Sequence, residues 1–248
     1  MVVRNLLLVG GIGFLVWGSA ALGLWSGDIV VPVSGVKIHF TLATSALWTA
    51  IGCTAMALWM VWDSKIGKVR SRERLLDEIR WTGSERVLDV GCGRGLMLIG
   101  AAKRLTSGTA TGIDIWQAED LSGNRPEATL NNAQREGVAN RIEVKTADMR
   151  QIPFPDGTFD VIVSCAAIHN LYVREDRAKT IREVARVLKP GGQALIADIR
   201  HLRQYAATFR ERGCAVERRI GSRIVTVLLA LITIGALRPA TLIVRKAA

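Results

Sequence analysis

The residues best suited to chemistry stand together in Arg86–Gly95, which reads RVLDVGCGRG. Asp89 lies in a short apolar run typical of a β-strand. Gly91, Gly93 and Gly95 follow at alternate positions, before an apolar segment with helical spacing. A strand, a glycine-rich turn and a helix in this order let a ligand approach bare backbone beside the unpaired N–H groups of the helix. We therefore expect a small-molecule site at this turn.

The acidic residues near the turn indicate which ligand it binds. The pattern Asp-x-Gly-x-Gly-x-Gly differs from the fingerprint of dinucleotide binding, and a carboxylate at Asp89 would repel a pyrophosphate but attract an ammonium group. Asp114 ends the next strand-like run, TATGIDIW, where its carboxylate can accept hydrogen bonds from both hydroxyls of a ribose. A ligand with an amine and a ribose is predicted, and S-adenosylmethionine (SAM) has both.

These motifs resemble those of a known enzyme family. From about Trp62 to the C-terminus the chain resembles the class I SAM-dependent methyltransferases, in the branch of ubiquinone/menaquinone-biosynthesis and other small-molecule methyltransferases. VLDVGCGRG matches the glycine motif of the family, and Asp114 matches its ribose-binding acid. Asp148 matches its adenine-binding acid, and Lys189–Gly192 matches its Pro-Gly-Gly turn. The resemblance implies a Rossmann-like, seven-stranded α/β sheet with helices on both faces; a nucleotide-binding fold of another kind is the alternative.

The resemblance also implies how SAM is held at its methionine and ribose ends. Asp89 is assigned to the amino group, directly or through water, and Asp114 to the ribose hydroxyls. Gly91, Gly93 and Gly95 allow close backbone approach.

The adenine is expected to lie between Ile115 and Trp116, whose indole can stack on it. Asp148 fits the exocyclic amine of the adenine, and the N–H of Met149 fits a ring nitrogen. Cys165, at the end of the fourth predicted strand, offers a backbone carbonyl to the amino group of the cofactor.

The methyl acceptor is expected just after the fourth strand, at SCAAIHNLY. The Asn-Pro-Pro-Tyr motif of methyltransferases that act on nucleobase or glutamine amino groups is absent there. His169 is the titratable side chain at this point, and it is a candidate general base for a hydroxyl, phenol or amine. The alternative is a structural histidine that caps the loop. The four cysteines have no zinc-site spacing, so no metal is expected.

Strands and helices alternate along 82–248, which predicts a parallel sheet covered by helices. The predicted strands are Arg86–Val90, Thr109–Ile115, Arg141–Thr146, Phe159–Cys165, Gln193–Asp198, Cys214–Arg219 and Ala240–Lys246. The last of these is antiparallel in the family. The predicted helices are Leu96–Leu105, Pro126–Glu136, Arg177–Leu188 and Gln204–Arg212. We expect Lys189–Gly192 to end the third of these helices.

Two uncharged apolar stretches precede this domain and predict a transmembrane hairpin in 1–62, with spans of about 6–25 and 40–62. Ser26–His39, between them, is rich in turn residues. A signal peptide is the alternative for the first stretch. The basic segment 63–81 is expected to be a juxtamembrane helix or linker.

Charge predicts the orientation of the hairpin. The chain holds 33 Lys and Arg against 22 Asp and Glu, and basic residues follow the second apolar stretch closely. Both ends of the hairpin are therefore expected on the cytoplasmic side. The basic residues are dispersed without interleaved aromatic residues, so no nucleic-acid partner is expected.

Ile224–Leu237 departs from the family because it is uncharged and strongly apolar. We expect it to lie on or dip into the membrane; a strand and hairpin packed on the domain, or a third crossing, are the alternatives.

Together these features predict an integral membrane methyltransferase with its catalytic domain in the cytoplasm. Its acceptor is expected to be a lipophilic small molecule or a lipid, because a membrane-held site can take its acceptor from the bilayer. The alternatives are a protein or RNA methyltransferase, supported by the net charge of +11, and a non-catalytic SAM-binding membrane protein.

Overall fold

The computed structural model describes residues 2–33, 36–117, 119, 123–219, 227, 233 and 239–248. The chain divides into two compact units, Met1–Ser71 and Arg72–Ala248. We describe each unit separately.

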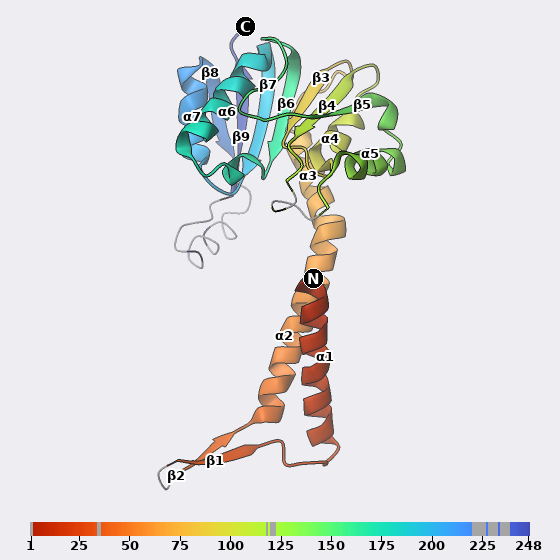
Figure 1. Cartoon of the computed structure of the whole chain (residues 1–248), viewed down its shortest axis with the longest axis vertical. Helices are drawn as coiled ribbons and strands as arrows, with labels where there is room; N and C mark the ends of the chain where they lie inside the picture. Colours follow the sequence, from red (N-terminus) through yellow and green to blue (C-terminus); the bar gives the residue numbers. More distant parts are fainter. Residues whose placement is uncertain are drawn as a thin grey trace. The chain divides into compact units, whose positions relative to one another are not determined.

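The first unit consists of helices joined by a β-hairpin (Figure 1). Its elements are α1 (Val2–Ala21), β1 (Ile29–Val33), β2 (Val36–Phe40), α2 (Leu42–Trp62) and a π-helical turn, η1 (Asp63–Gly67), which leads to α3 (Lys68–Leu76). A Cβ added at Gly13 would lie 2.7 Å from the carbonyl oxygen of Ala46. Glycine therefore lets α1 and α2 approach each other closely.

The long helices of the first unit expose apolar side chains. Among the described residues, α1 and the continuous helical run Leu42–Leu76 are long and apolar enough to cross a membrane, and 11% of the apolar window of each is buried. A helix in the core of a soluble protein would bury these side chains, whereas a signal sequence would share the length, composition and position of α1. The helix α1 ends at Ala21, before the predicted limit, because a turn follows with Gly23 at a φ of +75°.

The turn residues of Ser26–His39 do not by themselves predict the β1–β2 hairpin. IVVPV and VKIHF are rich in β-branched residues and stand two residues apart, which is a hairpin signal. The two strands pair antiparallel, from Ile29 opposite Phe40.

The second unit contains the seven-stranded α/β sheet that the sequence predicts (Figure 1). Its strands are β3 (Arg86–Val90), β4 (Thr109–Asp114), β5 (Ile142–Thr146), β6 (Phe159–Cys165), β7 (Leu188–Asp198), β8 (Cys214–Arg219) and β9 (Ala240–Lys246). The order is β5-β4-β3-β6-β7-β9-β8, with β3 to β7 parallel and β9 antiparallel to both of its neighbours. The segment predicted to touch the membrane, 224–237, lies outside the described residues except for 227 and 233.

Helices cover both faces of this sheet. They are α4 (Leu96–Ala102), α5 (Pro126–Arg135), α6 (Arg174–Val187) and α7 (Leu202–Glu211), with short 3-10 turns η2 (Ala139–Arg141) and η3 (Ile168–Asn170). Leu88 of β3 belongs to a buried cluster with Ile181 of α6 and Phe209 of α7. Its neighbour Val87 belongs to a second cluster with Leu98 of α4. Because successive strand residues point to opposite faces, α6 and α7 cover one face and α4 the other.

The boundary between α6 and β7 differs from the prediction. The helix begins at Arg174 instead of Arg177, since acidic residues in its first turn suit the positive end of a helix. Leu188 is already a strand residue, paired with Phe159, so Lys189–Gly192 lies inside β7 and does not end the helix. A register shift between β6 and β7 accommodates the extra residues.

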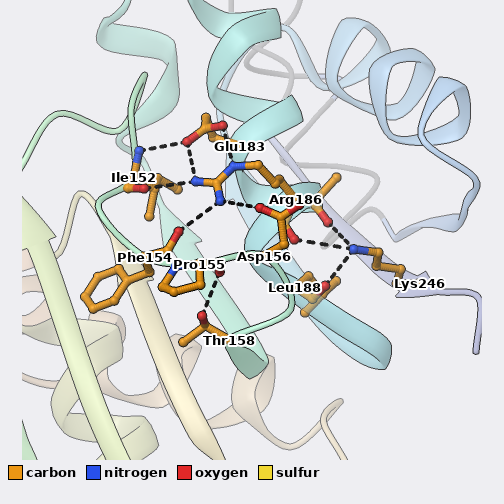
Figure 2. A network of polar contacts seen from close by, with 10 residues as sticks. Ile152, Phe154, Pro155, Asp156, Thr158, Glu183, Arg186, Leu188 and Lys246 are labelled. Carbon is orange, nitrogen blue, oxygen red and sulfur yellow. Dashed lines mark hydrogen bonds and ion pairs between the residues drawn. The ribbon is translucent and has the colours of Figure 1, made fainter.

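A polar network attaches α6 to the chain that precedes β6 (Figure 2). The guanidinium group of Arg186 donates to the carbonyl oxygens of Ile152 and Phe154 and to the carboxylates of Asp156 and Glu183. The backbone of this loop therefore has fixed partners on α6, which positions residues 148–150 just before it.

Candidate functional site

The predicted carboxylates lie at the ends of neighbouring strands. In the parallel pair of β3 and β4, Asp89 is beside Gly112, and Asp114 is the last residue of β4. The N–H of Gly93 donates to Oδ2 of Asp114 at 2.9 Å, which holds the turn after β3 against the end of β4. The structure thus brings Asp89, the turn and Asp114 together at the carboxyl edge of the sheet, where α/β sheets bind ligands.

The turn itself requires glycine. Gly91, Gly93 and Gly95 have φ angles of +71°, +50° and +87°, which residues with a Cβ rarely adopt. A Cβ at Gly91 would also collide with the Cβ of Ala167. From α5, the hydroxyl of Thr129 donates to the carbonyl oxygen of Gly93 at 2.6 Å. The backbone of the turn is therefore bare and held in place from both sides.

Asp89 is buried at the N-terminal end of α4. Its residue is 1% exposed, and its Oδ2 accepts a hydrogen bond of 2.9 Å from the N–H of Leu98 in the first turn of the helix. Burial raises the pKa of Asp89 to about 7, the charge of Asp114 adds to the rise, and the bond from Leu98 opposes it. The assignment of Asp89 to the amino group of the cofactor stays a prediction.

Asp114 is surrounded by donors. Its Oδ1 accepts from the N–H of Trp116 at 2.7 Å and from Nδ2 of Asn124 at 3.2 Å. Trp116 has a φ of +60°, and its indole N–H donates to Oγ1 of Thr146 at 2.9 Å. Ile115 is 43% exposed. These apolar side chains lie beside Asp114 as the sequence predicts, and their contact with an adenine stays a prediction.

Asp148 is already engaged in an ion pair. Arg150 donates to both carboxylate oxygens of Asp148, which holds the pKa of that carboxyl below its usual range, and also to Asp176. Met149 lies over the glycine turn, because its Cε is 3.4 Å from where a Cβ of Gly91 would stand. The structure brings Met149 to the site, while the predicted bond from an adenine amine to Asp148 would have to share this carboxylate.

The fourth predicted strand ends as expected. Cys165 is the last residue of β6 and pairs with Ala197 of β7. Ala166 follows with a φ of +53°, which turns the chain into η3. His169 lies in η3, directly after this turn, and its role at the methyl acceptor stays a prediction.

His169 faces a buried carboxylate that was not predicted as a site residue. Its Nδ1 lies 2.6 Å from Oδ1 of Asp198, although the ring N–H is not aligned for a hydrogen bond, and its backbone N–H donates to Oδ2 at 3.1 Å. The side chain of Asp198 is 1% exposed and also accepts from the N–H of Ile199 and the hydroxyl of Tyr205. Asp198 therefore holds the backbone of His169 by a hydrogen bond and lies against Nδ1 of its ring.

Sequence reasoning missed Asp198 and Asn124. Asp198 ends a predicted strand, as Asp114 does, so the same strand-end signal was present. Asn124 stands in the connection before α5, and no pattern in the sequence distinguishes it from the other asparagines nearby.

The acceptor groups at this site fit a ligand with a cationic amine and hydroxyl groups, and the apolar side chains beside them fit a flat ring. Carboxylates at Asp89 and Asp114 suit the amine and the hydroxyls. The buried Oδ1 of Asn124 has no hydrogen-bond partner among the described residues, which leaves an acceptor beside Asp114. Bare glycine backbone and the side chains of Trp116 and Met149 complete the surface.

Comparison with known proteins finds a family and several relatives that match this part of the chain. Residues 88–196 match the family described as a methyltransferase domain. The ubiquinone/menaquinone biosynthesis C-methyltransferase UbiE of Geobacter sulfurreducens is 33% identical over 130 residues, which are 52% of this chain and 47% of that protein. A fatty-acid O-methyltransferase of Mycolicibacterium smegmatis is 36% identical over 116 residues, 47% of this chain and 38% of that protein. The chain thus spans about half or less of the length of these curated relatives.

A solved structure shares the fold. A geranyl diphosphate methyltransferase in complex with SAM superposes with a TM-score of 0.55 at 17% identity, covering 73% of this chain and 85% of that one. The matched family segment contains the glycine turn, Asp114, Asp148 and His169, but not Asp198. Residues 88–196 therefore match a methyltransferase domain, the domain of an enzyme class that uses S-adenosylmethionine as cofactor.

Proposed function

We propose that this chain is a membrane-anchored methyltransferase that transfers the methyl group of SAM to a lipophilic small molecule or a lipid on the cytoplasmic side. The observation that carries the proposal is the exposed apolar surface of α1 and α2 in the same chain as a methyltransferase domain. Exposed apolar surface of this extent indicates contact with a membrane or a partner.

The relatives support a lipophilic acceptor. One is named for ubiquinone and menaquinone biosynthesis and another for a fatty acid. An enzyme anchored in a bilayer would meet acceptors of this kind at high local concentration.

The orientation rests on charge. Lys65, Lys68 and Arg70 follow the apolar part of the second helix, whereas the connection 22–41 carries one Lys and one Asp. Basic residues near the end of a span favour placing that end on the cytoplasmic side. The domain that uses SAM follows these residues in the chain, so the proposal places it on the cytoplasmic side as well.

The residues at the end of β6 support acid–base chemistry at the acceptor. SAM supplies an electrophilic methyl group, so the protein has to position the acceptor and take up its proton. With Nδ1 of His169 against Asp198, Nε2 is the ring nitrogen left to accept a proton from a hydroxyl, phenol or amine. The carboxylate of Asp198 stabilises the imidazolium that forms.

The test is a transfer assay with the full chain in detergent micelles, SAM labelled in its methyl group, and an extract of membrane lipids. We expect label in the organic phase that depends on the protein. Label found only in added protein or RNA would replace this proposal with the macromolecular alternative, which the net charge of +11 supports.

A further inference from the structure

Asn124 is a buried amide beside the predicted ribose-binding acid. The residue is 9% exposed and stands shortly before α5. Its Nδ2 donates to Oδ1 of Asp114 at 3.2 Å and to the carbonyl oxygen of Gln117 at 3.5 Å. Because both neighbours are acceptors, the NH₂ group must face them, and this fixes the orientation of the amide.

The other end of this amide is unpaired. Oδ1 of Asn124 is buried and has no hydrogen-bond partner among the described residues. A buried acceptor of this kind costs free energy, so native proteins rarely leave one unpaired. Its position on an amide already bonded to Asp114 suggests that it is completed by the same ligand.

The hydrogen bonds of Asp114 show why a second acceptor is needed. The carboxylate accepts from Gly93 at Oδ2, and from Trp116 and Asn124 at Oδ1. A carboxylate has about four acceptor positions, so roughly one remains, on Oδ2. A ribose presents two hydroxyl donors, and Asp114 cannot accept both while these bonds persist.

We propose that Asp114 and Asn124 divide the ribose between them. One hydroxyl donates to the remaining position on Oδ2 of Asp114, and the other donates to Oδ1 of Asn124. The proposal rests on SAM as the cofactor of this domain, and it revises the expectation that Asp114 accepts both hydroxyls. Asn124 is thus a cofactor-binding residue that also orients Asp114 through its NH₂ group.

The test compares ligands within one protein. The full chain in detergent is titrated by calorimetry with S-adenosylhomocysteine and with its 2′-deoxy and 3′-deoxy analogues. We expect Asn124→Ala to weaken binding of S-adenosylhomocysteine about tenfold, the loss typical of one hydrogen bond. One of the two analogues lacks the hydroxyl that donates to Asn124. Compared with S-adenosylhomocysteine, this analogue should bind the wild type about tenfold more weakly, but should bind Asn124→Ala with nearly the same affinity. Asn131→Ala, an exposed asparagine of α5, is the matched control and should behave as the wild type.

The titrations distinguish a contact between Asn124 and the ribose from a structural role of Asn124 and from a failure of the cofactor assignment. If both deoxy analogues lose as much affinity for Asn124→Ala as for the wild type, the amide does not contact the ribose, and a water molecule or structural role replaces the proposal. If the wild type binds no S-adenosylhomocysteine at all, the cofactor assignment fails as well. The comparison within Asn124→Ala does not depend on how much the variant loses in stability, and Asn124→Leu repeats it with a larger side chain.

Discussion

At the scale of single residues, the site depends on carboxylates whose surroundings differ. Asp89 is enclosed by the sheet and α4, and its pKa is raised from 3.8 to about 7. Between these values the folded chain keeps a proton that the unfolded chain has lost, so the contribution of Asp89 to stability falls as the pH rises through this window. A cationic amine bound nearby would favour the ionised carboxylate and release the proton.

The pH dependence of cofactor binding therefore tests Asp89. We expect the affinity for SAM to rise about tenfold from pH 5.5 to 7, with proton release seen by calorimetry in buffers of different ionisation enthalpy. Asp89→Asn should remove this dependence, while its amide oxygen can still accept from Leu98. An unchanged pH dependence in the variant would show that another group takes part.

His169 and Asp198 are tested by activity. We expect Asp198→Asn and His169→Ala each to lower the rate of methyl transfer about 100-fold, within the usual range for a general base, and to leave the affinity for SAM unchanged. His39→Ala, in β2 of the first unit, is the control. Full activity in His169→Ala would assign this histidine to the structural role considered above.

The residues that the sequence could predict are those whose place follows from a strand end. Asp89, Gly93 and Asp114 meet because carboxyl ends of parallel strands share one edge. The partnership of Asp114 with Asn124, and of Asp148 with Arg150, depends on side-chain directions in connections, which spacing does not determine.

At the scale of elements, the strands were predicted more closely than the helix ends. β3, β6, β8 and β9 have the predicted bounds. The start of β7 was predicted late, since proline and glycine in Lys189–Gly192 read as a turn, although Leu188 before them already pairs with Phe159 of β6. Pairing with a distant strand is not visible in local sequence.

The support of the glycine turn by α5 can be tested with Thr129→Val. Thr129 is fully buried and donates to Gly93, so the substitution keeps the shape and removes one hydrogen bond. We expect the thermal midpoint to fall by about 2–4 °C and the affinity for SAM to fall as well. Thr180→Val is the control, because Thr180 is equally buried but donates to Asp176 within α6. A similar loss of SAM affinity in both variants would mean that the turn is not supported in this way.

At the scale of the whole molecule, the chain combines an apolar helical unit with a methyltransferase domain. The family match begins at residue 88, so the proposed anchor rests on the first unit and not on the relatives. The sequence predicted both apolar helices because length and composition are sufficient for that. It could not identify the acceptor, because an acceptor pocket is formed by side chains from several loops.

The most direct measurement of the central claim is a calorimetric titration of the full chain in detergent with SAM. We predict saturable binding at one site, an affinity at least about tenfold weaker for Asp114→Ala, and no change for Glu143→Ala, whose side chain on β5 is 61% exposed. Absence of binding to the folded wild type, or equal affinity of Asp114→Ala and the wild type, would contradict the account.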